Sequence, residues 1–517
     1  MTNSSRKCYN QNMKKVTNLL KEKRFLLKPF LALCLIYLVA FSAILLAGVH
    51  YADDVARTNY GYPGWAAFGR YLSTASSLVL HADRYLTNIA PLPQLIAIVL
   101  LAVASVVLIC LVSGEEIFKE KWTKWIWRLV AVTPLVLCPY FLECFSYQYD
   151  APYMALSILF AVTPFMLRRK SLPVYLVALA VGVFGCCMTY QPSIGVALVL
   201  MIFLAVKNWN ESEKNEIKKP LMFLVCSGAV TVLVAFVFEK FLTIDRDIYV
   251  STSTPELNNF LPEFFNHLRH YYDLVVSDFR TIWLVLVALV ALVAVVMFAL
   301  RSKRNKIVAG LVMLVGVVLM AVAVYAPYSA LARPLYATRA MYPIGALVAT
   351  LGVYVVSGAM GKGWRKIVVV PAMILAWCFF VFAFTYGNAL KEQNDYRNFQ
   401  VAAAIQDVSE ILPGLGEGEK IVQADGQIGY APIIEHMPDS RYLILKRLMA
   451  ATFGKNVPWM AYQLTQRSGI ERLVYKPEVN LAERGLPTLK ETEFYTIYGN
   501  DEGILVKFKG EELGFEY

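Results

Sequence analysis

Two adjacent carboxylates, Asp53 and Asp54, follow directly after the first long apolar segment, which runs from about Phe25 to Val49. That segment is long enough to cross a hydrocarbon core of about 30 Å, so both acids lie where lipid meets water. One carboxylate can take a proton from an attacking hydroxyl as a general base, while the other orients it or holds a cation. The pattern predicts that Asp53 and Asp54 are catalytic and act on a substrate carried by a lipid phosphate. The alternative is a solvated loop or a helix cap.

Arginines in the same predicted surface are candidates for binding that phosphate. Arg333 and Arg339 lie in a short loop between two apolar segments, and Arg57 and Arg70 follow the acid pair. A guanidinium group can bind a phosphate with two parallel hydrogen bonds. The alternative is that these arginines are boundary charges that meet lipid head groups.

A polar hairpin between two apolar segments adds candidates for sugar binding. It runs from Glu143 to Asp150 and includes Tyr147 and Gln148; Gln191 lies in a similar turn. So many polar groups at a membrane edge are costly to bury without partners. Acids, amides and aromatic rings together fit a saccharide site, and a satisfied hairpin cap is the alternative.

The histidines show no metal-ligand pattern. His267 and His270 share a helical face, but no third ligand lies nearby in the sequence. A structural or catalytic metal usually takes three or four protein ligands. We therefore predict no metal site and no cofactor, and leave dependence on a divalent ion open.

The composition predicts an all-α polytopic membrane protein. Of the 517 residues, 58% are hydrophobic and 17% charged, against about 25% charged in ordinary soluble domains. We predict eleven spans, because a helix needs about 20 residues to cross the hydrocarbon core. They cover approximately residues 26–49, 92–113, 127–142, 150–167, 172–188, 191–206, 220–240, 281–300, 307–328, 341–359 and 367–387.

The distribution of Lys and Arg between the predicted spans predicts their orientation. Segments on one side hold 26 Lys and Arg and those on the other side hold 8. Because the cytoplasmic side is enriched in these residues, we place the basic N-terminus, residues 1–25, in the cytoplasm. Loops 50–91 and 242–280 and the C-terminal tail then face outside. Topology and membrane lipids explain the net charge of +11, and no nucleic-acid partner is predicted.

The outer segments contain further elements. Residues 64–80 and 260–272 have aromatic residues at helical spacing and are expected to lie in the interface next to the membrane domain, residues 26–387. The tail, residues 388–517, has a net charge of −5 and is predicted to be a small α/β domain. Its helix covers 394–412 and is expected to continue from the last span, and its strands cover 420–424, 471–475, 493–498 and 503–508.

Several of these motifs, taken in order, resemble those of a known family. The chain is similar over most of its membrane part to the serotype-converting O-antigen glucosyltransferases, the Gtr type II family. The motifs that carry the resemblance are Tyr51–Arg57, Gly61–Trp65, Gly69–Arg70, Phe145–Asp150, Tyr190–Ser193 and the Arg-Pro-Leu-Tyr run at 333–336.

The resemblance implies a GT-C type fold, a polyprenyl-phosphate-glucose donor and a lipid-linked O-antigen acceptor. Transfer would occur on the periplasmic side of the bacterial inner membrane and would modify lipopolysaccharide. Carried onto this chain, Asp53 or Asp54 would be the catalytic carboxylate, and Arg333 or Arg339 would bind the donor phosphate. Which member of each pair acts is left open.

Other functions remain as alternatives. The chain could be a polyprenyl-phosphate glycosyltransferase with another sugar or acceptor, or a flippase or transporter of lipid-linked sugars. Transport predicts charged residues inside the spans, where this sequence has almost none. A third interpretation makes the tail a module that binds the acceptor or a partner.

Overall fold

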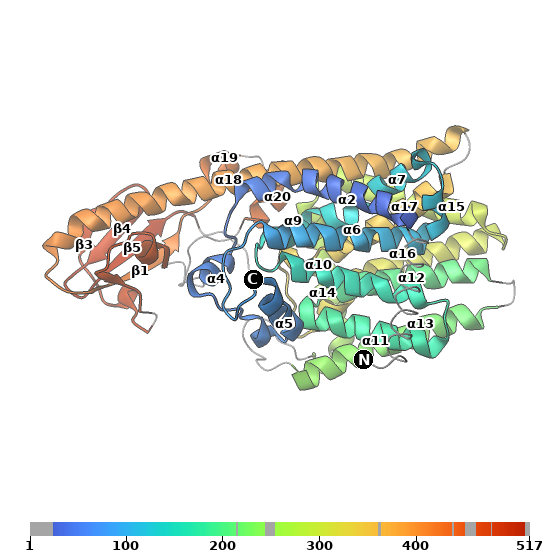
Figure 1. The fold of residues 1–517 in the computed structure, drawn as a ribbon, viewed down its shortest axis with the longest axis horizontal. Coiled ribbons are helices and arrows are strands. Elements are labelled where there is room, and N and C mark those ends of the chain that lie inside the picture. The colour runs from blue at the N-terminus through green and yellow to red at the C-terminus, as the bar shows by residue number, and fades with distance from the viewer. Residues whose placement is uncertain are drawn as a thin grey trace, which may run out of the picture.

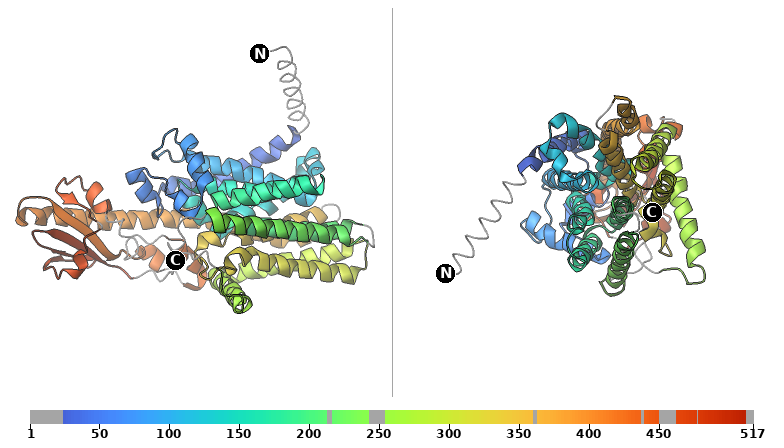
Figure 2. Two further views of the ribbon diagram at one scale, coloured as in Figure 1. Left: turned by 90° about the horizontal axis from the view of Figure 1, so that it is seen from below. Right: turned by 90° about the vertical axis from the view of Figure 1, so that its right-hand side faces the viewer.

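A helical bundle and a small sheet at one end of it make up the molecule (Figure 1). The computed structural model describes residues 24–212, 216–242, 254–359, 363–436, 439–449, 462–476 and 478–511. Nearly all of the predicted cytoplasmic N-terminus and residues 243–253 of the second outer loop lie outside these ranges. Viewed from below, the sheet projects from one end of the bundle (Figure 2).

The apolar segments of the chain fold into helices. In chain order these are α2 (Leu27–Ala40), α3 (Ser42–Ala47), α6 (Leu92–Ser113), α7 (Trp122–Val132), α8 (Pro134–Leu137), α9 (Pro139–Ser146), α10 (Ala151–Val162), α11 (Leu172–Thr189), α12 (Ser193–Glu211), α13 (Lys218–Leu242), α15 (Thr281–Arg301), α16 (Lys306–Ser329), α17 (Pro343–Ala359) and α18 (Val370–Ile411).

All eleven predicted spans contain helix, but the count of eleven spans is not confirmed. Among the described residues, seven helices are long and apolar enough to cross a membrane, and a bent pair would make eight. Helices α10 and α17 are shorter apolar helices, and the first segment is divided at Phe41 into α2 and α3. The seven helices are α6, α11, α12, α13, α15, α16 and α18.

The helix at the predicted span 127–142 is bent. Its two parts, Trp122–Leu137 and Pro139–Ser146, meet at 64°. Pro139 has no backbone N–H to continue the helix, and it forces Cys138 into an extended conformation with ψ 131°. The bend carries Glu143 on α9 into the protein interior, where the whole of α9 is buried.

Four elements lie between the bundle and the sheet or along the bundle's end. Helix α4 (Asp54–Tyr60), the 3-10 turn η2 (Trp65–Phe68) and α5 (Tyr71–Leu80) belong to loop 50–91, predicted to be the first outer loop. Helix α14 (Phe260–Asp278) belongs to loop 242–280, predicted to be the second. The predicted helices at 64–80 and 260–272 are therefore present. In Figure 1, α4 and α5 lie at the end of the bundle that faces the sheet.

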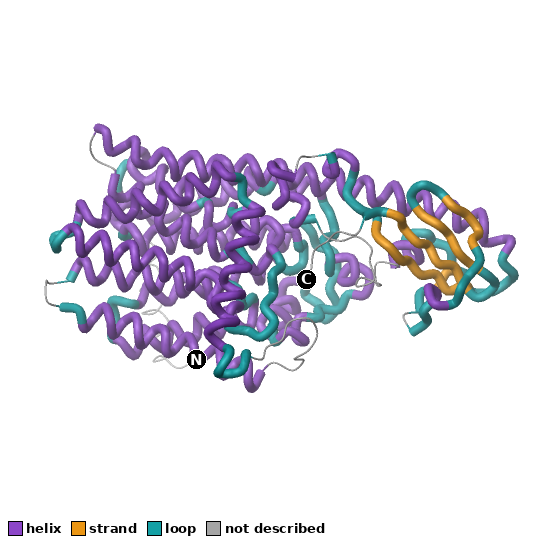
Figure 3. The backbone as a smooth tube through the Cα atoms, turned by 180° about the vertical axis from the view of Figure 1, so that it is seen from behind, coloured by secondary structure: helices purple, strands orange, loops and turns teal. Residues whose placement is uncertain are grey.

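The tail forms a five-stranded mixed sheet, coloured orange in Figure 3. Its order is β2-β1-β5-β4-β3, with β1 parallel to β2 and β5 and the other pairs antiparallel. The prediction missed β3 because this edge strand has a polar sequence, Thr-Leu-Lys-Glu. The strands are β1 (Lys420–Gln427), β2 (Leu473–Val474), β3 (Thr488–Glu491), β4 (Tyr495–Gly499) and β5 (Gly503–Lys509).

Helix α18 connects the two parts. Its 42 residues run without a break from the bundle to the sheet (Figure 1), across the boundary predicted at 387/388. Gly387 lets α18 approach α3 closely, because a Cβ there would lie 2.6 Å from the backbone of Ala43. This contact holds α3, the helix that leads into the first outer loop, against α18.

A second part of the tail returns to the bundle. Leu445 and Leu448, in and just after α20 (Asp439–Arg447), are fully buried in the same apolar core as the bundle helices. The hydroxyl of Tyr51 donates to the carbonyl of Leu448 at 2.6 Å. The tail therefore packs against the chain just before the acid pair.

Candidate active site

The acid pair lies at a turn that glycine makes possible. Helix α3 ends at Gly48, whose φ of +60° is readily adopted only without a Cβ. After a second left-handed residue, Ala52, the chain enters α4 with Asp53 as its N-cap residue and Asp54 as its first helical residue. The side chain of Asp53 makes no capping hydrogen bond, so the helix-cap alternative does not apply to it.

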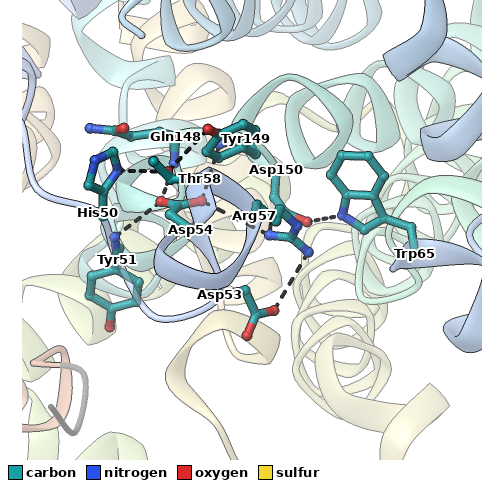
Figure 4. A network of polar contacts seen from close by, with 10 residues as sticks. All are labelled: His50, Tyr51, Asp53, Asp54, Arg57, Thr58, Trp65, Gln148, Tyr149 and Asp150. Atoms are coloured by element: carbon teal, nitrogen blue, oxygen red, sulfur yellow. Dashed lines mark hydrogen bonds and ion pairs between the residues drawn. The ribbon is translucent and has the colours of Figure 1, made fainter. Parts of the chain in front are cut away.

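Asp54 is a buried anchor. Its side chain is fully buried and accepts hydrogen bonds from the backbone N–H groups of Tyr51 at 3.1 Å and Gln148 at 2.8 Å (Figure 4). The N–H of Tyr149 adds a third at 3.3 Å. Burial raises the pKa of Asp54 to about 8, an effect larger than the lowering by Arg57 and the N–H donors. Asp54 therefore holds the first outer loop against the polar hairpin.

Arg57, one turn along α4, crosses from the acid pair to Asp150. The Arg57 guanidinium donates to the Asp150 carboxylate, and the other oxygen of that carboxylate accepts from the Trp65 indole N–H. The guanidinium also lies over the Trp65 ring, 4.8 Å from its centroid. Since Arg57 and Asp150 are both buried, this charged pair is shielded from water and held in one geometry.

Asp53 is the exposed member of the pair. Its side chain is 57% exposed and points away from Asp54 (Figure 4), with one oxygen 3.6 Å from the Arg57 guanidinium. Arg57 holds Asp53 on one side, and the rest of the carboxylate remains accessible. Among the acids predicted for the site, Asp53 thus has the exposure that contact with a substrate hydroxyl requires.

A second charged pair lies under the loop before α17. Glu143 accepts from the Arg339 guanidinium at 3.2 Å and from the Thr338 hydroxyl. The carbonyl of Arg339 in turn accepts from the Tyr190 hydroxyl at 3.2 Å. Glu143 is buried and Arg339 nearly so, which makes this pair a brace between α9 and the 3-10 turn η5 (Thr338–Ala340).

Arg70 lies between the two charged pairs. Its Nε donates to the Gln191 side chain at 3.3 Å, and its guanidinium stacks on the Tyr190 ring at 4.8 Å. It is close enough to Asp150 for their charges to interact. No described carboxylate forms an ion pair with Arg70, so its charge is available to a ligand.

The remaining predicted residues divide into buried and exposed ones. Tyr147 is buried with its ring edge-on to Tyr51, centroids 4.9 Å apart. Gln148 is buried too and contributes its backbone N–H to Asp54. The side chain of Arg333 is exposed and forms no ion pair or hydrogen bond with any described residue. The structure thus brings Asp53, Arg57, Asp150, Arg70 and Gln191 together, and it shows no ion pair or hydrogen bond between any of them and Arg333.

Sequence reasoning missed three polar contributors to this region. Trp65 was assigned to the interface, yet its indole N–H holds Asp150. Thr338 was not considered, although it directly precedes Arg339 and donates to Glu143. Asp278, the last residue of α14, pairs with Arg447 of the tail and accepts from the Tyr140 hydroxyl at 2.7 Å. The sequence signal that could have identified Asp278 is an acidic residue at the end of an amphipathic helix.

The described ranges hold no group of three or more His, Cys, Asp and Glu side chains arranged to bind a metal ion. The expectation of no cofactor stays a prediction, as does the dependence on a divalent ion that the sequence left undecided.

Comparison with known proteins points to one family. A family model described as "Glucosyl transferase GtrII" matches residues 42–350, which include the acid pair, the polar hairpin and both Arg70 and Arg339. A curated relative is an "Uncharacterized 55.3 kDa protein in gtrB 5'region" of Salmonella phage P22, 23% identical over 219 residues. That alignment covers 42% of this chain and 42% of the relative. No solved structure matches.

Proposed function

This chain belongs to the GtrII glucosyltransferase family, and from that premise we propose that it transfers glucose from polyprenyl-phosphate-glucose to a lipid-linked O-antigen saccharide. The reaction takes place on the periplasmic face of the bacterial inner membrane, where the first outer loop and the tail lie. The observation that carries the proposal is the exposed carboxylate of Asp53, held by a buried arginine directly after the first apolar helices.

Asp53 acts as the general base. An acceptor hydroxyl attacks the anomeric carbon of the donor glucose while Asp53 takes the hydroxyl proton. A new bond forms between the acceptor oxygen and that carbon, and the bond from the carbon to the phosphate oxygen breaks. The polyprenyl phosphate leaves with the electron pair. Arg57 fixes the position of Asp53 because Asp150 and Trp65 hold the guanidinium in place.

Arg70 stabilises the negative charge that grows on the departing phosphate. It has no carboxylate partner among the described residues, and Tyr190 and Gln191 orient it. Arg339, by contrast, is occupied by Glu143 and serves to brace the site.

The test is a transfer assay with the purified full-length protein, polyprenyl-phosphate-glucose and a lipid-linked saccharide acceptor. Release of polyprenyl phosphate and gain of glucose by the acceptor are both measured. Asp53→Asn should lower kcat by about 100-fold or more, the usual contribution of a general base. Asp83→Asn, which changes an exposed acid of the same outer loop, should leave the rate unchanged.

A protein that moves the intact donor lipid across a vesicle membrane without releasing polyprenyl phosphate would be a transporter, and the proposal would be wrong. Replacing the glucose donor by other polyprenyl-phosphate sugars, and the acceptor by other lipid-linked glycans, identifies the preferred substrates.

A further inference from the structure

A buried, unneutralised arginine lies where the tail meets the first outer loop. Arg397 of α18 is only 8% exposed, yet it forms no ion pair with any described acidic residue. Its Nη2 donates to the Asn394 side chain, whereas its Nε has no hydrogen-bond partner among the described residues. Buried charges in proteins are nearly always paired, because an unpaired one loses its hydration without compensation.

A second guanidinium lies beside the first. Arg467, which follows α21 (Tyr462–Gln466), donates to the Asn398 side chain at 2.6 Å and has no acidic partner in the described part of the chain. Its charge acts directly on Arg397. Two like charges at one place destabilise the folded protein unless an anion joins them.

The site also has an unused acceptor. Gln400, one turn after Arg397 on the same helix, is 2% exposed, and its Oε1 has no hydrogen-bond partner within the described ranges. An inorganic anion would need only the guanidinium donors. A ligand with both an oxyanion and a hydroxyl would satisfy Arg397 and Gln400 together.

The pair of Arg397 and Arg467 lies near the start of the first outer loop. Burial lowers the pKa of His50, and the positive charges of Arg397 and Arg467 lower it further. The ring of His50 lies 3.4 Å from the hydroxyl of Thr58 on α4. Both arginines therefore lie within electrostatic range of the chain that carries Asp53.

Aromatic rings extend the same junction. Tyr60, at the end of α4, lies edge-on to Tyr462 with centroids 4.6 Å apart, and Tyr462 lies edge-on to Tyr475 at 4.5 Å. Tyr60 is 41% exposed. Exposed aromatic faces beside polar side chains are suited to saccharide rings, which have apolar C–H faces and polar rims.

We propose that Arg397 and Arg467 form a binding site for an oxyanion carried by the acceptor saccharide, distinct from the donor site at Arg70. The oxyanion is a phosphate group of the lipid linkage or a carboxylate of an acidic sugar, with Gln400 and Tyr60 contacting the adjoining sugar. This inference rests on the proposed function for the name of its ligand, but not for the anion site itself.

The test is calorimetric titration of the purified full-length protein with inorganic pyrophosphate and with glucuronate. Arg70→Gln is the background, so that the donor site does not contribute. Adding Arg397→Gln or Arg467→Gln should weaken binding about tenfold or more, since a hydrogen bond to a charged group is worth at least about one decade in Kd. Stronger binding of pyrophosphate points to a lipid diphosphate, and stronger binding of glucuronate to an acidic sugar.

The matched control is Arg484→Gln, which removes the same charge from an exposed pair with Glu502 in the same domain. It should leave the affinity unchanged. Because Arg397 is buried, its variant could misfold, and the exposed Arg467 then provides the decisive result. Equal affinity in Arg467→Gln, or an equal loss in the control, would overturn the inference.

Transfer kinetics separate this inference from the proposed function. Arg467→Gln should raise the KM for the acceptor with little change in kcat, while the KM for the donor stays constant. If the protein binds pyrophosphate through Arg467 but transfers no glucose, the proposed function fails and the anion site stands. If Asp53→Asn abolishes transfer and Arg467→Gln changes neither affinity nor KM, the anion site fails alone.

Discussion

The carboxyl groups of Asp53 and Asp54 are adjacent in the chain and differ completely in environment. That of Asp53 is 57% exposed and lies 3.6 Å from the Arg57 guanidinium, while that of Asp54 is fully buried under three backbone N–H groups. The same helix start thus supplies one accessible carboxylate and one that ties the loop to the polar hairpin. Different consequences are expected when each is changed.

Removing the Asp54 carboxyl should destabilise the protein. Asp54→Ala leaves three buried N–H groups without an acceptor, and we expect a loss of about 3 kcal/mol in the free energy of unfolding. Asp54→Asn keeps one acceptor oxygen and should lose much less. Denaturant titration of the purified protein in detergent measures both. A stable Asp54→Ala protein would show that the hairpin is held by other contacts.

The pH dependence of stability should reveal the raised pKa of Asp54. Burial raises that pKa to about 8, against an ordinary value of 3.8. The folded protein then holds the proton more tightly than the unfolded chain, so the contribution of Asp54 to stability is complete below about pH 4. It is lost progressively as the pH rises from about 4 to about 8. Unfolding midpoints measured from pH 4 to 9 should therefore fall for the wild type relative to Asp54→Asn, and a constant difference would contradict the raised pKa.

The fold was largely predictable from sequence because apolar length and charge gaps are local signals. The segment 92–113 was predicted with the bounds of α6, and 172–188 differs from α11 by one residue. The bend at Pro139 was missed because an apolar run does not show where a helix changes direction. Strand β3 was missed because an edge strand with half-exposed side chains lacks an apolar pattern.

The site was predicted in its residues but not in its pairings. Asp53, Arg57 and Asp150 were all candidates, yet only the fold pairs Arg57 with Asp150, an acid 93 positions further along the chain. Sequence alone predicted Arg339 as a phosphate ligand, because it does not show that Glu143 is the ion-pair partner of Arg339. Arg397 was not among the predicted site residues, because the sequence does not show that other parts of the fold bury this helical arginine.

The buried pair of Arg57 and Asp150 should be essential for the stability of the protein as well as for the position of Asp53. Asp150→Ala removes the closest acid from a buried guanidinium and the acceptor of the Trp65 indole. We expect a loss of about 3 kcal/mol or more in the free energy of unfolding. The double variant Arg57→Leu with Asp150→Leu leaves no charge uncompensated and should recover part of that stability while remaining inactive. An equally unstable double variant would show that packing rather than charge is at fault.

The two arginines that flank Tyr190 should behave differently. Arg70→Gln removes a charge that has no acid partner in the described part of the chain. It should therefore raise the KM for the polyprenyl-phosphate donor or lower kcat while the unfolding midpoint changes little. Arg339→Gln leaves the Glu143 carboxylate buried without its cation and should lower the unfolding midpoint. Kinetics and thermal unfolding of both variants test the distinction. The opposite pattern would assign the phosphate to Arg339.

Attachment of the tail to the bundle should depend on Asp278. This buried acid at the end of α14 pairs with Arg447 of α20, whose guanidinium also donates to the carbonyl of Tyr336 at 3.1 Å. Asp278→Ala leaves Arg447 partly buried without an acid, and we expect α20 to leave the bundle more often, with faster proteolysis of the tail. Because Tyr51 donates to Leu448 just beyond α20, the same change should also lower the transfer rate by displacing the start of the first outer loop.

The control is Asp273→Ala on the same helix, where an exposed pair with Arg269 at 3.7 Å contributes little. Equal proteolysis of the two variants would mean that apolar contacts of Leu445 and Leu448 alone hold the tail in place.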